Sequence, residues 1–376
     1  MAMDSPPEEM IADETQVCLP EQWLEAADAI AYDSTTSPPP ICVVCGSLNS
    51  GKTNFSRHLL NVFISRYRRV CYLDTDVDQA EFTPPGCLSL TVIDKVTPDL
   101  AIPCLRTPER SFFFGDITPR RDPKIYLTYI HALYDYYYKN YQQSMMGESL
   151  FKVGVPLVVN APGWVEDTGY DILVNMLKYI APSHVVKVRA DQSKNLPPGD
   201  FWLEEGAAQD VTVVEIDSDC QDSLKKTVCA QNNAHLLRDL RLVAYFRKCF
   251  PTNMSLKTIE ELDHRLAAHP PYEIPMSTVT INQLHCQAPC NKTIDMSDIT
   301  IVGLVASSTT CERMPCCVGL GIVRGVDTSR KILYLITPIP KHILKNVDIL
   351  LHGFIKTPAC LLQVQRHMTS NTRSTD

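Results

Sequence analysis

Between residues 41 and 250, short apolar runs alternate with stretches in which apolar residues recur every three or four positions. The runs have the length of buried β-strands, and the periodic stretches are typical of amphipathic helices. Such alternation predicts an α/β domain, a parallel sheet whose strands are joined by crossover helices. The predicted strands are Ile41–Cys45, Val70–Asp74, Cys87–Ile93, Phe112–Phe114, Leu157–Asn160, Val185–Val188 and Val211–Ile216.

After Pro251 the helical patterns mostly stop, and β-rich pieces broken by glycine and proline follow. They predict a second, smaller and mainly β domain over residues 251–364. Residues 1–39 are expected to form an N-terminal tail and linker with one short helix near Glu21–Ala31, and residues 365–376 a polar tail. The predicted strands of the second domain are Ser277–Ile281, Asp298–Ser307, Val318–Val323 and Lys331–Thr337.

A glycine-rich stretch follows the first predicted strand and fits the phosphate-binding pattern G-x-x-x-x-G-K-[ST]. Its glycines let the backbone curl so that successive N–H groups point at phosphate oxygens. Lys52 then reaches the β and γ phosphates of ATP, and the Thr53 hydroxyl can ligate Mg²⁺. A helical stripe begins at Phe55, so the phosphates would lie at a helix N-terminus. The predicted ATP-binding residues are Gly46, Ser47, Leu48, Asn49, Ser50, Gly51, Lys52 and Thr53.

The strand Val70–Asp74 ends in a run of acidic residues, at the sheet edge where open α/β sheets bind their ligands. A carboxylate there can hold the hydration shell of Mg²⁺ or take the proton from an attacking hydroxyl. We favour Asp76 for these roles, with Asp74 and Asp78 as alternatives. The competing interpretation is a solvated acidic turn. These patterns together predict a P-loop NTPase sheet with flanking helices.

The composition limits which classes of partner the chain is expected to bind. The 376 residues carry a formal net charge of −8, so a nucleic-acid partner would have to be held by a local basic patch. No apolar run is long enough to cross a membrane, and no membrane partner is expected. The 15 cysteines are scattered and odd in number, which is typical of free thiols in a reducing compartment.

The string Asp76–Gly86 resembles the D-x-G-Q-x-E-F-x-P-P-G run of the nucleolar polynucleotide 5′-hydroxyl kinases. Phe114–Pro119, Val159–Val165 and Gly319–Gly325 are also similar to segments of that family. The resemblance implies an ATP-dependent enzyme that phosphorylates RNA 5′ ends, with DNA as a second acceptor, during ribosomal-RNA maturation. It also implies pre-rRNA processing factors as partners, and the nucleus, within it the nucleolus, as location.

The predicted acceptor-binding residues are Gln79, Thr118 and Trp164, and the resemblance supports a clasp role for Trp164. Trp164 follows the strand Leu157–Asn160 and could stack on the terminal base, although a tryptophan at a strand end is often core. Arg238 and Arg241 share one face of a predicted helix and could close over the phosphates, as in related kinases. A solvated basic face is the alternative.

Other aromatic residues favour a structural role. Tyrosines recur at helical spacing after Asp122-Pro123, from Tyr126 to Tyr141, and predict core packing rather than RNA stacking.

Cys42 and Cys45 are three residues apart on a strand and should face opposite sides of the sheet.

Two features depart from the family. Asp78 occupies the position where the family usually has glycine, and the first forty residues cannot supply the additional N-terminal β-rich domain of many members. The sequence therefore leaves open a catalytically weak ATP-binding assembly factor, and a small-molecule kinase as a third function. The leading prediction is a kinase with Lys52, Asp76, Arg238 and Arg241 as catalytic residues and with Mg²⁺ held by Thr53 and Asp76.

Overall fold

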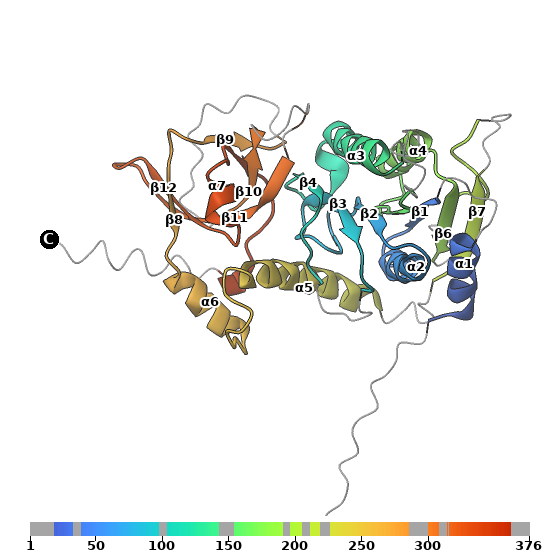
Figure 1. Ribbon diagram of the computed structural model, residues 1–376, viewed down its shortest axis with the longest axis horizontal. Helices are drawn as coiled ribbons and strands as arrows, with labels where there is room; N and C mark the ends of the chain where they lie inside the picture. The colour runs from blue at the N-terminus through green and yellow to red at the C-terminus, as the bar shows by residue number, and fades with distance from the viewer. Residues whose placement is uncertain are drawn as a thin grey trace, which may run out of the picture.

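The computed structural model describes residues 19–32, 39–97, 104–142, 154–190, 196–204, 211–218, 226–285, 300–307, 314 and 316–361. Two sheets lie side by side in this part of the chain (Figure 1). The first has seven strands in the order β4-β3-β2-β5-β1-β6-β7, and the second has six in the order β8-β12-β11-β10-β13-β9.

The first sheet confirms the predicted α/β class, with one difference in strand direction. Strands β2, β5, β1, β6 and β7 are parallel, but β3 pairs antiparallel with both β2 and β4. Residues 75–86 form turns rather than a crossover helix, so the chain reverses direction after β2. The strands are β1 Ile41–Gly46, β2 Val70–Asp74, β3 Cys87–Ile93, β4 Arg110–Phe113, β5 Leu157–Asn160, β6 His184–Arg189 and β7 Thr212–Asp217.

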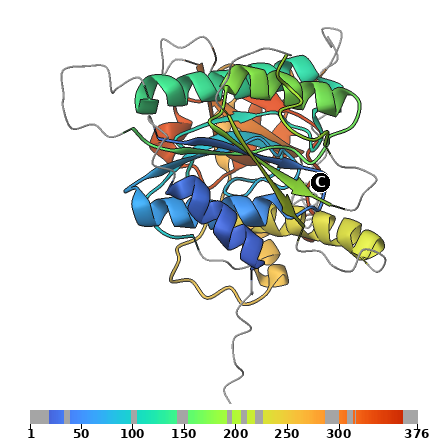
Figure 2. The same ribbon diagram turned by 90° about the vertical axis from the view of Figure 1, so that its right-hand side faces the viewer.

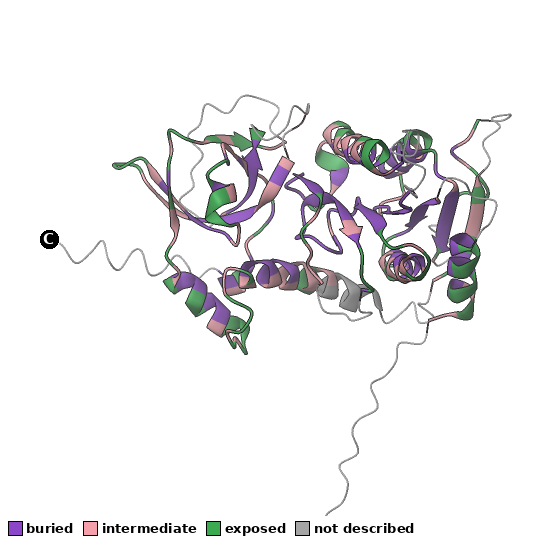
Figure 3. Ribbon diagram, viewed as in Figure 1, coloured by how far each residue is buried: buried purple, intermediate pink, exposed green. Residues whose placement is uncertain are grey.

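Helices cover both faces of this sheet. Figure 2 shows α1 and α2 (blue) on one side and α3 and α4 (green) on the other. Cys42 packs toward α1 and α2 while Cys45 packs toward α3 and α4, as their spacing predicts. The strands between these layers are largely buried, apart from the edge strand β7 (Figure 3). The helices are α1 Glu21–Ala31, α2 Lys52–Arg66, the 3₁₀ turn η1 Pro119–Arg121, α3 Pro123–Tyr137, the π turn η2 Tyr138–Gln142, α4 Thr168–Ile180 and α5 Lys226–Arg247.

Helix α3 turns its aromatic stripe inward. Asp122 caps it by accepting a hydrogen bond from the backbone N–H of Ile125 at 3.0 Å. Tyr126 and Tyr137 are fully buried and Tyr134 nearly so, and their hydroxyls donate to backbone carbonyls. Core packing of this stripe is therefore confirmed.

The second sheet is antiparallel except for the parallel pair β13 and β9. The predicted strand Ser277–Ile281 is wrong in its first half, because Thr278 donates its N–H and hydroxyl to the carbonyl of Pro275 and makes a turn. Helices α6 and α7 were not predicted after Pro251. The elements are α6 Ile259–Ala268, β8 Tyr272–Pro275, β9 Thr280–Gln283, β10 Thr300–Ala306, β11 Cys316–Asp327, β12 Ile332–Ile336, α7 Lys341–Leu344 and β13 Ile349–His352.

The two sheets share a hydrophobic core. Phe113 of β4 is 1% exposed and lies on Gly303 of β10, where a Cβ would come within 2.5 Å of the ring. The Ser111 hydroxyl donates to the carbonyl of Cys317 on β11 at 2.8 Å. Helix α5 runs beneath both sheets and buries Leu242 and Phe246 in the same cluster (Figure 1). The second domain is therefore packed firmly against the edge of the first.

We expect Phe113→Ala to lower the free energy of unfolding by about 3–5 kcal/mol, because the residue is fully buried between the sheets and leaves a cavity. Urea titration followed by circular dichroism measures the change. Tyr32→Ala, at a tyrosine that is 57% exposed, is the control and should cost under about 0.5 kcal/mol. Equal midpoints for the two variants would contradict the shared core.

Candidate active site

The glycine loop joins β1 to α2, in the order that the sequence predicts. Gly51 caps α2 in the left-handed region with φ +93°, and a Cβ on Gly46 would overlap the carbonyl oxygen of Val188. Both positions therefore require glycine. The Lys52 ammonium is buried and donates to the carbonyl of Ser47 at 2.8 Å, so it folds back over the loop.

Charge and burial around Lys52 suit an anionic ligand. Burial lowers the pKa of the Lys52 ammonium, and the carboxylate of Asp76 opposes that effect. The two side chains predicted to act together are thus electrostatic neighbours. The Ser50 hydroxyl is buried in the loop and has no hydrogen-bond partner among the described residues. A phosphate would supply the missing acceptor and favour the charged lysine.

Loop 161–164 after β5 lies directly against the glycine loop. A Cβ on Gly163 would come within 3.1 Å of the Lys52 ammonium and 2.9 Å of the Leu48 Cα. Leu48 itself is 55% exposed at the tip of the loop. The carboxyl ends of β1 and β5 therefore form one continuous edge with that of β2, as in other open α/β sheets.

Asp74 is a structural hub at this edge. Its Oδ2 accepts from the backbone N–H of Glu81 at 2.6 Å, and its Oδ1 accepts from the N–H of Asp76 at 3.2 Å and the Asn160 side chain at 3.3 Å. Burial raises the pKa of Asp74 to about 7, against the opposing effect of the Glu81 N–H. Both oxygens are occupied, so Asp74 fixes the acidic segment to β5 rather than serving a ligand.

Asp76 keeps one carboxylate oxygen free of protein contacts. Its Oδ1 accepts from the backbone N–H groups of Asp78 and Gln79 at 3.0 and 3.1 Å, and no described residue donates to Oδ2. The side chain is thus fixed by its own turn with one oxygen to spare. Together with the half-buried Thr53 hydroxyl, it supplies the hard oxygen donors that Mg²⁺ prefers. Gln79 is half-buried, and its side chain has no hydrogen-bond partner among the described residues.

Helix α5 directs both predicted arginines at the acidic segment. Arg238 pairs with Asp78 at 2.6 Å, and Arg241 lies 3.8 Å from Glu81. Glu81 also pairs with Arg57 of α2. Arg241 is 8% exposed, and its Nε and Nη1 have no acceptor among the described residues. A buried guanidinium with unused donors fits an anion such as a phosphate.

Thr118 and Trp164, two of the three predicted acceptor residues, lie beside turn η1. The Thr118 hydroxyl accepts from the backbone N–H of Arg120 at 3.4 Å and so caps the turn. The Arg120 guanidinium lies 4.6 Å from the centre of the Trp164 ring. The indole also lies on Gly169, where a Cβ would come within 2.6 Å of the ring. Trp164 is only half-buried, and a base that stacks on the face held by Arg120 must displace that guanidinium.

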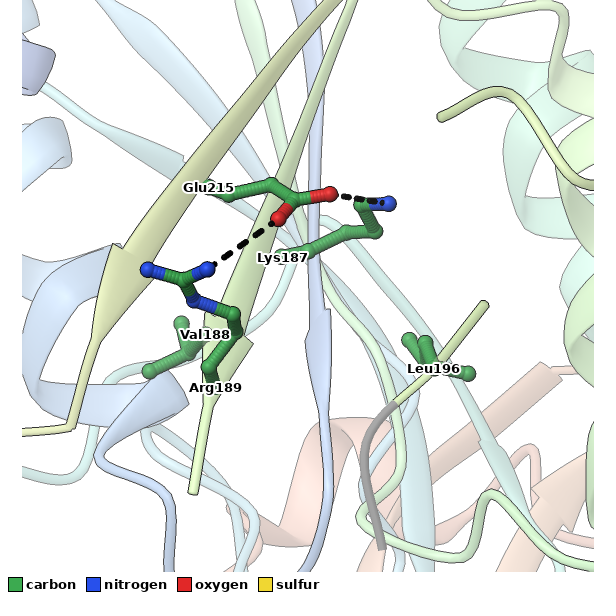
Figure 4. Close-up of a pocket in the computed structure, with 5 residues that line it drawn as sticks. All are labelled: Lys187, Val188, Arg189, Leu196 and Glu215. Carbon is green, nitrogen blue, oxygen red and sulfur yellow. Dashed lines mark hydrogen bonds and ion pairs between the residues drawn. The ribbon is translucent and has the colours of Figure 1, made fainter. Parts of the chain in front are cut away.

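Sequence reasoning did not foresee a support of the glycine loop, Trp23, or a buried lysine on the neighbouring strand β6, Lys187. Trp23 of α1 is fully buried, donates to the carbonyl of Asp217 at 2.8 Å, and would contact a Cβ on Gly51 at 2.9 Å. Lys187 of β6 fills a small pocket beside β1, where it pairs with Glu215 at 2.6 Å (Figure 4). The only sequence signal for Trp23 was its place in the helix predicted near Glu21–Ala31.

The titration of Asp74 makes stability depend on pH. Between about pH 4, where an unfolded aspartate titrates, and about pH 7, the folded protein keeps a proton that the unfolded chain loses. Its contribution to the free energy of unfolding therefore falls as pH rises, by up to about 4 kcal/mol. We expect Asp74→Asn to remove this decline. Urea titrations at several pH values measure it, and parallel curves for the two proteins would contradict the assignment.

Family models match most of the chain. One described as "mRNA cleavage and polyadenylation factor CLP1 P-loop" matches residues 46–247, and another described as "NOL9-like, C-terminal domain" matches residues 267–358. A solved structure of a Clp1p–Pcf11p complex superposes with a TM-score of 0.61 at 16% identity, over 89% of this chain and 79% of that one. This likeness supports the fold.

In the described residues no helix has the length and apolar character to span a membrane.

Curated relatives are named polynucleotide 5′-hydroxyl-kinase NOL9. The one from Arabidopsis thaliana is 48% identical over 92% of this chain and 93% of its own length. Those from Danio rerio and Homo sapiens are 30% and 27% identical over 87% of this chain, which spans about half of their length, 47% and 51%. With a P-loop model over more than half of its residues and a relative matched nearly from end to end, the chain belongs to the NOL9 family of polynucleotide 5′-hydroxyl kinases.

Proposed function

We propose that this protein is an ATP-dependent polynucleotide 5′-hydroxyl kinase that phosphorylates RNA 5′ ends, with DNA as a second acceptor. The buried Lys52 ammonium folds over the glycine loop, and Asp76 follows β2 at the same sheet edge, where its charge acts on the lysine. This arrangement supports the proposal most directly, because phosphoryl transfer needs a cation on the phosphates and a base at the attacking hydroxyl. The names of its relatives support the same reaction.

Each part of the site has a role in this reaction. The backbone of residues 46–53 and Lys52 bind the ATP phosphates, and Asp76 orients or deprotonates the 5′-hydroxyl. Mg²⁺, held by Thr53 and Asp76, would neutralise charge on the phosphates. Gln79, Thr118 and Trp164 hold the acceptor end. Arg238 and Arg241 stabilise the charge that develops on the transferred group, and Arg241 already has unused donors.

We also propose a process and a location for the enzyme. The resemblance of the acidic segment to the nucleolar kinases supports a role in ribosomal-RNA processing, with pre-rRNA processing factors as partners, in the nucleolus. Epitope tagging followed by microscopy and analysis of co-purified RNA tests both.

A catalytically weak ATP-binding assembly factor is the second candidate, and the Asp78–Arg238 pair favours it. The pair is mostly buried at 23% and 19% exposure and engages an arginine that the kinase reaction would use. An assembly factor would bind ATP and associate with partners without transferring phosphate.

Lys52→Ala should lower phosphate transfer by at least about 100-fold, because it removes a buried cation from the phosphates. The fold should persist, since burial already disfavours the charge of Lys52. Transfer of labelled phosphate from ATP to 5′-hydroxyl RNA, DNA and nucleoside acceptors measures it. Lys178→Ala, at an exposed lysine of α4, is the control and should retain full activity. Unchanged transfer by the Lys52 variant would refute the assignment.

Asp78→Asn and Arg238→Ala separate the two candidate functions. Asparagine weakens the ion pair, so Arg238 turns to the phosphates at lower cost and kcat should rise by up to about tenfold. Removing Arg238 should lower kcat by about 100-fold. Steady-state kinetics with saturating RNA gives both values. If neither substitution alters turnover, Arg238 does not act in the reaction.

A further inference from the structure

Turn η1 joins two aromatic rings from different domains, the half-buried Trp164 and the exposed Phe354, through consecutive arginines. Arg120 lies 4.6 Å from the ring centre of Trp164, in the loop after β5. Arg121 lies 4.0 Å from the ring centre of Phe354, which follows β13 of the second sheet. The two rings therefore flank one turn at the junction of the domains, beside the expected position of the acceptor end.

Phe354 is held in place without serving the core. Its N–H donates to the carbonyl of Gly115 at 2.5 Å, and a Cβ on Gly353 would overlap that same oxygen. Its ring is nevertheless 41% exposed, whereas the neighbouring Ile355 is buried at 7%. Its ring lies under the Arg121 guanidinium, so Phe354 forms part of the surface beside turn η1 rather than part of the core.

A second ring extends this surface. His285 stacks with Phe354 at 6.2 Å between ring centres and 27° between planes. Its Nε2 lies 2.7 Å from the carbonyl oxygen of Phe114, which fixes the imidazole to the first domain. The planar groups thus follow one another from Trp164 across the two arginines to Phe354 and His285.

The charge of this surface is positive within an acidic protein. Arg121 pairs with Asp116, and Arg120 pairs with no carboxylate among the described residues. A chain of net charge −8 can hold nucleic acid only where cations gather locally. Rings that alternate with cations are typical of surfaces for single-stranded nucleic acid, since every base has a face to stack.

We propose that the acceptor strand continues from Trp164 across η1 and stacks a further base on Phe354 and His285 of the second domain. This rests on the proposed kinase function and names the path of its substrate. A guanidinium and a base are alternative planar partners for one ring face. On binding, Arg120 and Arg121 move from the rings to backbone phosphates, with which they form stronger, charge-assisted hydrogen bonds.

The length of the acceptor provides the test. With wild-type enzyme, KM should decrease as the acceptor becomes longer. The series begins with a nucleoside 3′-phosphate that has a free 5′-hydroxyl and continues with oligonucleotides of increasing length. Phe354→Ala should raise KM for the long acceptor by about fivefold or more, with kcat unchanged and KM for the nucleoside 3′-phosphate unaltered. Phe354→Tyr, which keeps the ring, should restore the wild-type value.

Tyr32→Ala is the matched control, because Tyr32 is an exposed ring under the Arg66 guanidinium on another part of the surface. It should leave every KM unchanged. Equal KM values for wild type and Phe354→Ala across the length series would overturn the strand path while the kinase function stands. If Tyr32→Ala raises KM for the long acceptor as much as Phe354→Ala does, the strand path is overturned too.

A binding measurement separates failure of the path from failure of the kinase. If wild-type protein transfers no phosphate to any acceptor, the proposed function fails. Fluorescence anisotropy with a labelled 5′-hydroxyl oligoribonucleotide then reports the path directly. Weaker binding by Phe354→Ala than by Phe354→Tyr would support it, and equal binding by the two variants would overturn it.

Discussion

The carboxyl edge of the first sheet depends on the mutual neutralisation of buried charges. Three carboxylates follow β2 within a few residues, and cations from the glycine loop, α2 and α5 face them. Either set alone would be costly to bury, because an unpaired charge loses its hydration without compensation. The acidic set is Asp76, Asp78 and Glu81, and the basic set is Lys52, Arg57, Arg238 and Arg241.

This pairing also joins distant parts of the chain into one site. Arg238 and Arg241 reach the acidic segment from a helix that begins after the whole first sheet. The same helix buries Leu242 and Phe246 between the two domains, so its arginines are placed by a hydrophobic contact one turn away. A change in the packing of the second domain would therefore reach the phosphate site through α5.

The second domain places one of its side chains, Phe354, beside the site. A Cβ on Gly353 would overlap the backbone of Gly115, and Phe113 packs on Gly303 nearby. These glycine contacts set Phe354 beside turn η1, opposite Trp164. The proposed acceptor side of the site thus lies on a domain junction, where binding sites commonly form.

Local patterns in the sequence determined the strand-loop-helix unit around Lys52, the two-sided burial of Cys42 and Cys45, and the inward tyrosines of α3. Each rests on periodicity or on backbone conformations within about ten residues, which a sequence records directly. The tertiary structure alone decided the antiparallel direction of β3, the pairing of Arg238 with Asp78, and the support of Gly51 by Trp23. These depend on which distant segments exclude water from one another, and neither spacing nor residue type specifies that.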